Sequence, residues 1–232
     1  MIEEIAWDTA FFGRKIGRIA PPASAEEIRQ ILEWAGREKF AYLTCRLDAL
    51  EVRAVQILET AGFYVTDFGL VFERGPEGLK PPRKAVRQAA PEDSDAVGRI
   101  AADLFSDGRF YRDPFFTGDE ASRLYRAWAE NSVKGTAADR VFLIDGEGFV
   151  TCKISGGEGK IVLFGVSADH RGKGTGSALI LTALGWFRDE GALRVKVRTQ
   201  AGNLPAIGFY GRMGFMVSSA DITMGKVLLS QS

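Results

Sequence analysis

The sequence has few cysteines, a single histidine and no net charge, and each shortage excludes a class of protein. Its 30 basic residues balance its 30 acidic residues, so it has no dominant basic surface for DNA or RNA, and we expect no nucleic-acid partner. Cys45 and Cys152 are far apart in the chain and lack the spacing of metal ligands. We therefore expect two buried, reduced thiols and no metal site.

Long apolar runs and a leader-like start are also missing. No apolar run approaches the length that crosses a membrane, and residues 1–4 lack the basic and apolar regions of a secretory signal. We therefore expect a cytoplasmic protein with no membrane partner. At 232 residues, the chain is longer than one usual domain, which favours one large domain or two small ones.

A glycine-rich loop is the most informative feature that the sequence does contain. Residues 161–166 are apolar and β-branched enough for a buried strand, and apolar residues recur every three to four positions from Ile180 to Phe187, which predicts a helix over 177–187. Between them, residues 170–176 place three glycines at alternate positions. Such a backbone can approach an anion, and the first helical turn adds unpaired N–H donors. The segment therefore predicts a diphosphate site.

Two common nucleotide-binding loops do not fit this segment. A Walker loop has Ser or Thr directly after its lysine, but Gly174 follows Lys173. A dinucleotide-binding fingerprint that starts at Gly172 requires glycine where the chain has Ser177. ATP and NAD are therefore disfavoured as ligands.

A second motif follows downstream of the glycine loop. Residues 193–198 alternate as a strand, and Asn203 then has the character of a helix N-cap, with Pro205 in the tolerant first turn. Asn203, Ala206 and Tyr210 are spaced three and four apart, so they share one face of the predicted helix.

Both motifs resemble those of the GNAT superfamily of N-acyltransferases. Arg171-x-x-Gly174-x-Gly176 is similar to the loop by which that superfamily holds the pyrophosphate of acetyl-CoA. The stretch from Asn203 to Phe215 is similar to its Asn-x-x-Ala-x-x-x-Tyr-x-x-x-Gly-Phe signature, without a mismatch. The resemblance implies an α/β (α+β) fold with a mixed central sheet flanked by helices, and acetyl-CoA as the cosubstrate. The residues it assigns to acetyl-CoA are Val166, Arg171, Gly172, Lys173, Gly174, Thr175, Gly176 and Asn203.

The same resemblance makes Tyr210 the catalytic acid that protonates the departing CoA thiolate. The alternative is a tyrosine that only packs in a helix. Many members of the superfamily carry a glutamate base on the central strand, but residues 161–166 contain no titratable group. We therefore expect a water chain or bulk solvent to take the proton of the amine.

A segment rich in proline, glycine and charge, residues 74–83, predicts a linker. It separates an N-terminal domain of residues 1–73 from a catalytic acetyltransferase domain of residues 84–232. The elements expected early in the second domain are a strand at 85–89, a helix at 93–105 and a hairpin of 141–144 and 149–152 around Asp145-Gly146.

The first half of the chain aligns with the second when it is shifted by 152 positions. Residues 41–65 then match residues 193–217 without a gap, and Arg46 falls on Arg198. We expect residues 1–73 to be a degenerate partial repeat of the GNAT fold, with convergence of two strand–helix–strand units as the alternative. Because the first copy lacks both motifs, we expect one CoA site per chain.

Three further segments resemble the branch of the superfamily formed by the TDP-fucosamine acetyltransferases: residues 7–13, 108–114 and 125–136. The resemblance implies that the acceptor is the amino group of TDP-4-amino-4,6-dideoxygalactose, or a related nucleotide amino sugar, for surface glycan synthesis. It also favours a homodimer.

The acceptor residues that we expect are Arg109, Tyr111, Arg112 and Asp113. The two arginines are suited to a diphosphate, and the aromatic residues nearby are suited to stacking on a base or a sugar. The alternative is that these aromatic side chains pack in the core and the arginines are solvated.

Two other functions stay open. The first keeps acetyl-CoA and has a protein N-terminus, a lysine or a small amine as the acceptor, which the arginine and aromatic residues at 108–116 disfavour. A CoA-binding regulatory module without turnover is disfavoured because Asn203 and Tyr210 are both retained.

Overall fold

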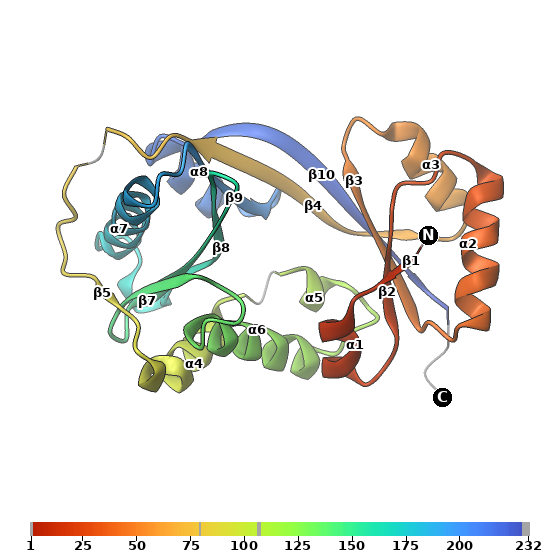
Figure 1. Ribbon diagram of the computed structural model, residues 1–232, viewed down its shortest axis with the longest axis horizontal. Coiled ribbons are helices and arrows are strands. Elements are labelled where there is room, and N and C mark those ends of the chain that lie inside the picture. Colours follow the sequence, from red (N-terminus) through yellow and green to blue (C-terminus); the bar gives the residue numbers. More distant parts are fainter. Residues whose placement is uncertain (1, 79, 106–107, 229–232) are drawn as a thin grey trace.

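The computed structural model describes residues 2–78, 80–105 and 108–228, which form one ten-stranded mixed sheet with helices on its faces (Figure 1). The strand order is β1-β2-β3-β10-β4-β9-β8-β7-β6-β5. The expected mixed sheet flanked by helices is therefore confirmed. Position 79 of the expected linker, and the outermost positions 1 and 229–232 of the expected domains, lie outside the described residues.

The N-terminal half begins with two short antiparallel strands joined through a helix and continues as alternating helices and strands. Its elements are β1 (Ile2–Glu4), α1 (Ala6–Phe12), β2 (Ile16–Ile19), α2 (Ala25–Arg37), β3 (Tyr42–Asp48), α3 (Val52–Thr60) and β4 (Tyr64–Arg74). Helix α2 starts after Ser24, whose hydroxyl accepts the N–H of Glu27 at 3.2 Å.

The C-terminal half contains the predicted strands and helices of the two motifs. Its elements are β5 (Arg87–Gln88), α4 (Ser94–Leu104), α5 (Arg109–Arg112), α6 (Gly118–Val133), β6 (Arg140–Ile144), β7 (Gly148–Ser155), β8 (Glu158–Val166), α7 (Thr175–Asp189), β9 (Arg194–Gln200), α8 (Leu204–Arg212) and β10 (Met216–Val227). The predicted strands at 161–166 and 193–198, the helix at 177–187 and the hairpin are confirmed. The strand expected at 85–89 is reduced to two residues, Arg87 and Gln88.

Each half places its last strand against the other half. Strand β4 pairs with β9 from Gly69↔Gln200 to Arg74↔Val195, and β10 pairs with β3 from Asp221↔Asp48 to Val227↔Tyr42. The two exchanged strands also pair with one another, and Figure 1 shows them as the long ribbons that run between the halves. The two parts of the chain expected as domains therefore share one continuous sheet.

The offset of 152 residues in the sequence coincides with the bounds of the elements. Shifted by 152, β3 falls on residues 194–200 and α3 on residues 204–212, which are the bounds of β9 and α8. The pairing agrees as well, since Arg46 lies opposite Thr223 and Arg198 lies opposite Val71, a pair of equivalent positions. The GNAT-like character of residues 1–73 stays a prediction.

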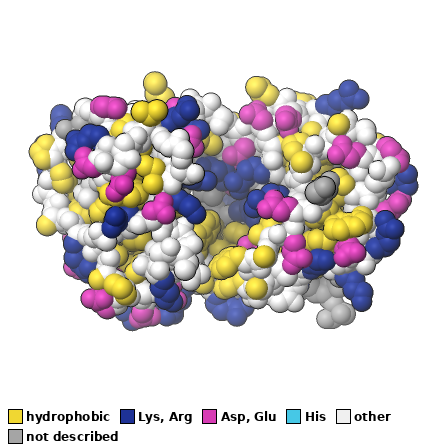
Figure 2. Space-filling view, in the orientation of Figure 1, with side chains coloured by type: hydrophobic (Ala, Val, Ile, Leu, Met, Phe, Trp, Pro, Cys, Tyr) yellow, Lys and Arg dark blue, Asp and Glu magenta, His cyan; other side chains and the backbone are white. Residues whose placement is uncertain are grey.

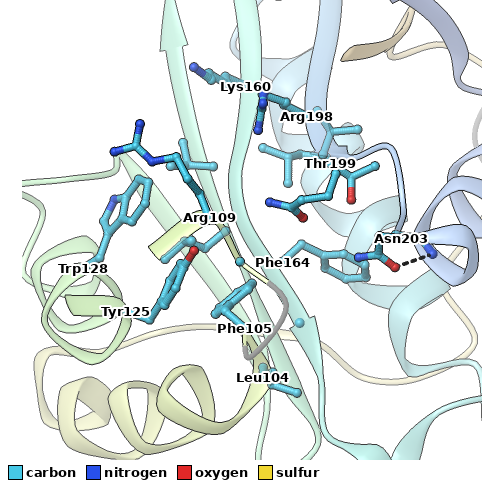
Figure 3. A pocket seen from close by; sticks show the side chains of 18 of the residues that line it. Leu104, Phe105, Arg109, Tyr125, Trp128, Lys160, Phe164, Arg198, Thr199 and Asn203 are labelled. Atoms are coloured by element: carbon cyan, nitrogen blue, oxygen red, sulfur yellow. Dashed lines mark hydrogen bonds between the residues drawn. The ribbon is translucent and has the colours of Figure 1, made fainter. Parts of the chain in front are cut away.

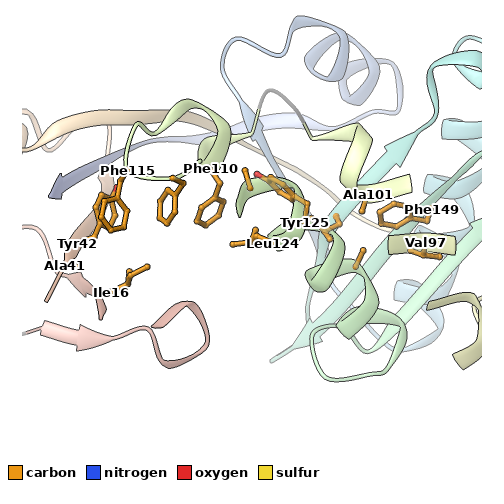
Figure 4. Close-up of a cluster of buried hydrophobic side chains, with 14 of the residues drawn as sticks. Ile16, Ala41, Tyr42, Val97, Ala101, Phe110, Phe115, Leu124, Tyr125 and Phe149 are labelled. Carbon is orange, nitrogen blue, oxygen red and sulfur yellow. The ribbon is translucent and has the colours of Figure 1, made fainter. Parts of the chain in front are cut away.

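One hydrophobic cluster crosses from one half to the other beneath the sheet (Figure 4). The ring of Tyr42 in β3 stacks on Phe115 with centroids 4.5 Å apart, and the cluster continues through α6 to Phe149 of β7. Phe110, Phe115 and Phe116 are all buried in it. These three rings therefore pack in the core.

The cysteines follow the expectation from the sequence. Cys45 and Cys152 are free and buried, and burial raises the pKa of the Cys45 thiol to about 12.

Across the described ranges, no group of three or more His, Cys, Asp or Glu side chains could hold a metal ion, and no helix has the length and apolarity to cross a membrane.

Removal of residues 1–73 is expected to unfold the remainder of the chain. Strand β10 would lose β3 and β4, β9 would lose β4, and the long unpaired edges favour aggregation. Circular dichroism and gel filtration of the fragment 84–232 check this. The matched control is the full chain cut by a protease within residues 75–83, which should stay assembled because β4 and β10 remain paired. A monomeric fragment that unfolds cooperatively would contradict the expectation.

Candidate active site

A cavity of about 1590 Å³ lies between the two halves. Its walls come from α1, β2, β3 and β4 of the N-terminal half and from α4, α5, α6, β8, β9, α8 and the start of α7, with the loop before it, of the C-terminal half. Figure 2 shows Lys and Arg side chains gathered in the hollow at the middle of the molecule. The residues of both sequence motifs reach this one cavity.

The glycine loop forms an open cradle at the start of α7. Gly172 and Gly174 have φ angles of 72° and 85°, which favour glycine, and no heavy atom lies within 4 Å of where a Cβ would stand on either. No side chain caps the first turn of α7, so its N–H groups are available to an anion. Arg171 donates from Nε to the carbonyl of Val166 at 3.2 Å, which ties the loop to the end of β8.

Two residues of the expected cradle have side chains outside the cavity. Thr175 is fully buried, and its hydroxyl donates to Glu147 Oε2 at 2.5 Å and accepts from Lys84 Nζ at 3.0 Å. Neither Thr175 nor Lys173 lines the cavity. The hydroxyl of Thr175 is therefore engaged away from the cavity, and contact of Lys173 with acetyl-CoA stays a prediction.

Strands β8 and β9 separate beside the cradle. Their parallel pairing runs from Glu158↔Arg194 to Ile161↔Val197. Beyond it, β8 continues to Val166 along β7 and β9 continues to Gln200 along β4. The facing edges of both strands line the cavity, where they leave a slot with backbone donors and acceptors on its walls.

A β-bulge in β8 accompanies this separation. Phe164 pairs with Val150 of β7, whereas Ile161 pairs with Cys152, so β8 has one more residue than β7 in this interval. In consequence Val162 and Leu163 both pack against the cluster under α4 and α6, while Phe164 turns toward α8. The bulge thereby re-aims the end of β8 at the cradle.

Asn203 and Tyr210 lie on the opposite side of the slot, on α8. The side-chain oxygen of Asn203 accepts the N–H of Ala206 at 3.2 Å, the predicted N-cap, and the residue borders the cavity (Figure 3). The Tyr210 ring packs between Phe72 and Phe164, at 5.7 and 6.2 Å between centroids. Burial raises the pKa of its hydroxyl, which therefore stays protonated at neutral pH.

Of the expected acceptor residues, Arg109 is the one whose side chain lines the cavity. Its NH1 donates to Thr44 Oγ1 at 3.3 Å, and its guanidinium lies 4.5 Å from the centroid of the Phe110 ring. The hydroxyl of Tyr111 donates to the Ala102 carbonyl at 3.4 Å instead. Arg112 lies beside Gly202, in the loop before α8. The structure does not bring Tyr111 or Arg112 into the lining of the cavity.

The expectation for Asp113 is corrected, because its side chain is wholly buried away from the cavity. Its carboxylate accepts from the hydroxyl of Tyr42 and from that of Tyr64, the latter at 2.9 Å, and from the N–H of Phe115 at 3.0 Å. Asp113 therefore anchors the segment after α5 to strands β3 and β4.

The sequence analysis missed several charged residues that line the cavity, among them Asp8, Arg46, Lys160 and Arg198. Figure 3 shows Lys160 and Arg198 on neighbouring strands, with Arg109 across from them. The alignment of Arg46 with Arg198 was a signal, because the same charge recurs on a mostly apolar strand. Lys160 directly precedes the stretch judged free of titratable groups.

The comparison with protein families agrees with this geometry. The model of the acetyltransferase (GNAT) family matches residues 102–215, which include the slot, the cradle and Tyr210. The chain therefore carries a GNAT acetyltransferase domain and is an acyltransferase. GNAT enzymes use acetyl-CoA as the acetyl donor.

Relatives extend the similarity to the N-terminal half. The chain is 26% identical to a dTDP-fucosamine acetyltransferase of Escherichia coli O6:H1 across 94% of both chains. It is also 31% identical to a mycothiol acetyltransferase of Clavibacter sepedonicus, over 63% of this chain and 47% of that enzyme.

Solved structures show the same fold. A GCN5-related N-acetyltransferase from Sphaerobacter thermophilus matches with a TM-score of 0.63 and 16% identity, over 94% of this chain and 74% of that one. A tandem GNAT protein from the clavulanic acid biosynthesis pathway matches with a TM-score of 0.61 and 12% identity, over 94% and 76%.

Gly174→Val is expected to weaken the binding of acetyl-CoA at least about tenfold, the equivalent of 1.4 kcal/mol, since valine is strained at positive φ and narrows the cradle. Calorimetric titration with acetyl-CoA measures it. The matched control is Gly191→Val, which places the same strain at a φ of 77° after α7, away from the cavity lining. Equal affinity in folded Gly174→Val and parent proteins would exclude this loop as the pyrophosphate site.

Proposed function

We propose that the protein is an N-acetyltransferase that transfers the acetyl group of acetyl-CoA to the amino group of a nucleotide-linked amino sugar. One observation supports this most directly: a single cavity has an anion cradle and an open slot at one end, and excess cationic side chains from both halves at the other. The likeness to dTDP-fucosamine acetyltransferase across 94% of both chains supports TDP-4-amino-4,6-dideoxygalactose or a relative as the acceptor, for surface glycan synthesis.

The cradle and the slot suit acetyl-CoA, which supplies an activated acetyl thioester. The backbone N–H groups from Gly172 to Gly176 and the Arg171 side chain would hold the pyrophosphate. The unpaired edge of β8 up to Val166, with Asn203 opposite, would hold the extended arm that ends in the thioester. A chain that pairs with a strand edge satisfies backbone groups that are otherwise left without partners.

Tyr210 is the proposed acid. Its hydroxyl makes no hydrogen bond to another described residue, so its proton is available to a group in the cavity. Apolar rings on several sides keep it protonated. A positioned acid that protonates the leaving thiolate favours expulsion of CoA over expulsion of the amine.

Asp8 is the proposed partner of the acceptor amine. Asp67, another carboxylate of the cavity wall, is already engaged by Arg198 at 2.9 Å, whereas Asp8 forms no ion pair or hydrogen bond with any described residue. Burial raises the pKa of Asp8 despite the attraction of Arg109 and Arg18. A carboxylate in this setting attracts an ammonium group, and water in the open cavity can then carry its proton away.

A second candidate function keeps acetyl-CoA and changes the acceptor to another small-molecule amine. The 31% identity with a mycothiol acetyltransferase favours it, although the matched region covers 47% of that enzyme. A peptide or protein acceptor, a cytoplasmic location and a homodimer stay predictions.

An acceptor panel tests the proposed function. With acetyl-CoA as donor, TDP-4-amino-4,6-dideoxygalactose is expected to show a kcat/KM at least about 100-fold above that of free lysine or a peptide N-terminus, a difference of roughly 2.7 kcal/mol in transition-state binding. Release of free thiol and the mass of the product measure it. Preference for the peptide would replace the proposed acceptor.

Tyr210→Phe is expected to lower kcat by about 10²-fold, the lower end of general-acid effects, while the affinity for acetyl-CoA stays the same. The ring keeps its packing, and only the hydroxyl proton is lost. Steady-state kinetics with the best acceptor measure the change. Unchanged kcat in Tyr210→Phe, with chemistry rate-limiting, would remove Tyr210 from the mechanism.

Asp8→Asn is expected to stabilise the fold and impair the enzyme. Because the pKa of Asp8 is higher in the folded protein than its unfolded value of 3.8, the folded protein loses stability as the pH rises from 3.8 through the folded-state pKa. Asparagine stays neutral at every pH, so the variant should have a higher Tm than the parent at pH 7 and the same Tm at pH 3. The kcat/KM for the acceptor should fall. Thermal melts and kinetics measure both effects, with the exposed Asp189→Asn as control. A variant with full activity would show that Asp8 does not hold the amine.

A further inference from the structure

The end of the cavity away from the cradle holds more positive than negative charge. Four of its cationic side chains come from four different elements of the fold, β3, α5, β8 and β9, and Arg18 of β2 lines the cavity as well. Two carboxylates, from β4 and β10, bind Arg198, and a third, that of Asp8, interacts electrostatically with Arg109. The four cations are Arg46, Arg109, Lys160 and Arg198, and the two carboxylates that bind Arg198 are those of Asp67 and Asp221.

Arg198 binds both of these carboxylates. Its Nε and NH2 donate to the two oxygens of Asp221 at 2.8 and 2.6 Å, and its NH1 donates to Asp67 at 2.9 Å. Gly69 makes this possible, because a Cβ at that position would overlap the guanidinium of Arg198. Arg198 thus engages both carboxylates, and Asp221 is shared with Arg46, so these two carboxylates do not balance the charge of all four cations.

Arg46 is the first cation whose charge these carboxylates balance only in part. Its Nε donates to Thr223 Oγ1 at 3.2 Å and lies 3.7 Å from Asp221 Oδ1, while its terminal nitrogens make no hydrogen bond to a described residue. Its side chain is 49% exposed. Burial, and then repulsion by Arg198, lowers the pKa of Arg46 to about 10. A planar guanidinium with free nitrogens is suited to two oxygens of a phosphate.

Lys160 is the second cation of this end of the cavity. It lies on β8, one position before the last paired residue, Ile161, so it stands at the inner end of the slot. It forms no ion pair within the described part of the chain, and burial, followed by the charge of Arg46, lowers its pKa. Both side chains are therefore held in a cationic environment that an anion would stabilise.

We propose that Arg46, Lys160 and Arg109 form a second phosphate site, separate from the glycine cradle, which binds the diphosphate of the acceptor. That the phosphate belongs to the acceptor rests on the proposed function; the site itself rests on the charges and geometry above. Arg46 and Arg198 occupy equivalent positions of the two halves. The N-terminal half, which lacks the glycine loop, would thus contribute acceptor recognition through Arg46.

The test is calorimetric titration of thymidine diphosphate, and of inorganic pyrophosphate, into protein saturated with CoA, so that the cradle is already filled. Arg46→Gln and Lys160→Gln are each expected to lower the affinity for both ligands at least about tenfold, because each variant loses one charge-assisted contact. The affinity for acetyl-CoA should not change. Arg188→Gln and Lys134→Gln are exposed control substitutions far from the cavity lining.

A measurement without ligand guards against misfolded variants. Because the cations repel one another, Arg46→Gln and Lys160→Gln should match or exceed the parent Tm in low salt, with the difference shrinking in high salt. Folded variants that bind both ligands like the parent would overturn the site.

The two proposals can fail separately. If the true acceptor lacks a nucleotide, the affinity for pyrophosphate should still depend on Arg46 and Lys160, and the second site stands. If the nucleotide sugar is acetylated but both variants keep its KM, the proposed function stands and the second site is wrong.

Discussion

The antiparallel pairing of β4 with β10 is the interaction on which the rest of the structure depends. It runs from Met216↔Glu73 to Gly225↔Tyr64 at the centre of the sheet, and each strand has its other edge on the opposite half. Because backbone hydrogen bonds fix this register, β3 and β9 lie at set positions on either side. The cavity, with walls from both halves, follows from that arrangement.

The same exchange explains how β8 can have an open edge. Strand β9 finds a full-length partner in β4, so it separates from β8 after Ile161 without losing its place in the sheet. The bulge in β8 then turns Phe164 toward α8. Unpaired backbone groups in a protein interior are unfavourable unless another group pairs with them, so an open edge inside a cavity favours a ligand that does.

The local elements and the two motifs could be predicted from sequence, because apolar periodicity, the Asn203 cap and the glycine loop depend on neighbours in the chain. The strand exchange could not, since alternation indicates which face is buried and not which strand lies alongside. Asp113 was misassigned because its partners, Tyr42 and Tyr64, are 71 and 49 positions away. Arg46 was passed over because a charge on a strand usually marks a solvated face.

A crystal structure with CoA and thymidine diphosphate both bound tests the central claim most directly, namely that one shared cavity holds donor and acceptor together. The account predicts one CoA per chain, with its pyrophosphate on Gly172 to Gly176 and its arm between β8 and β9. It predicts the second diphosphate against Arg46 and Lys160, between the halves. Thymidine diphosphate bound outside the cavity, or a second CoA on the N-terminal half, would contradict it.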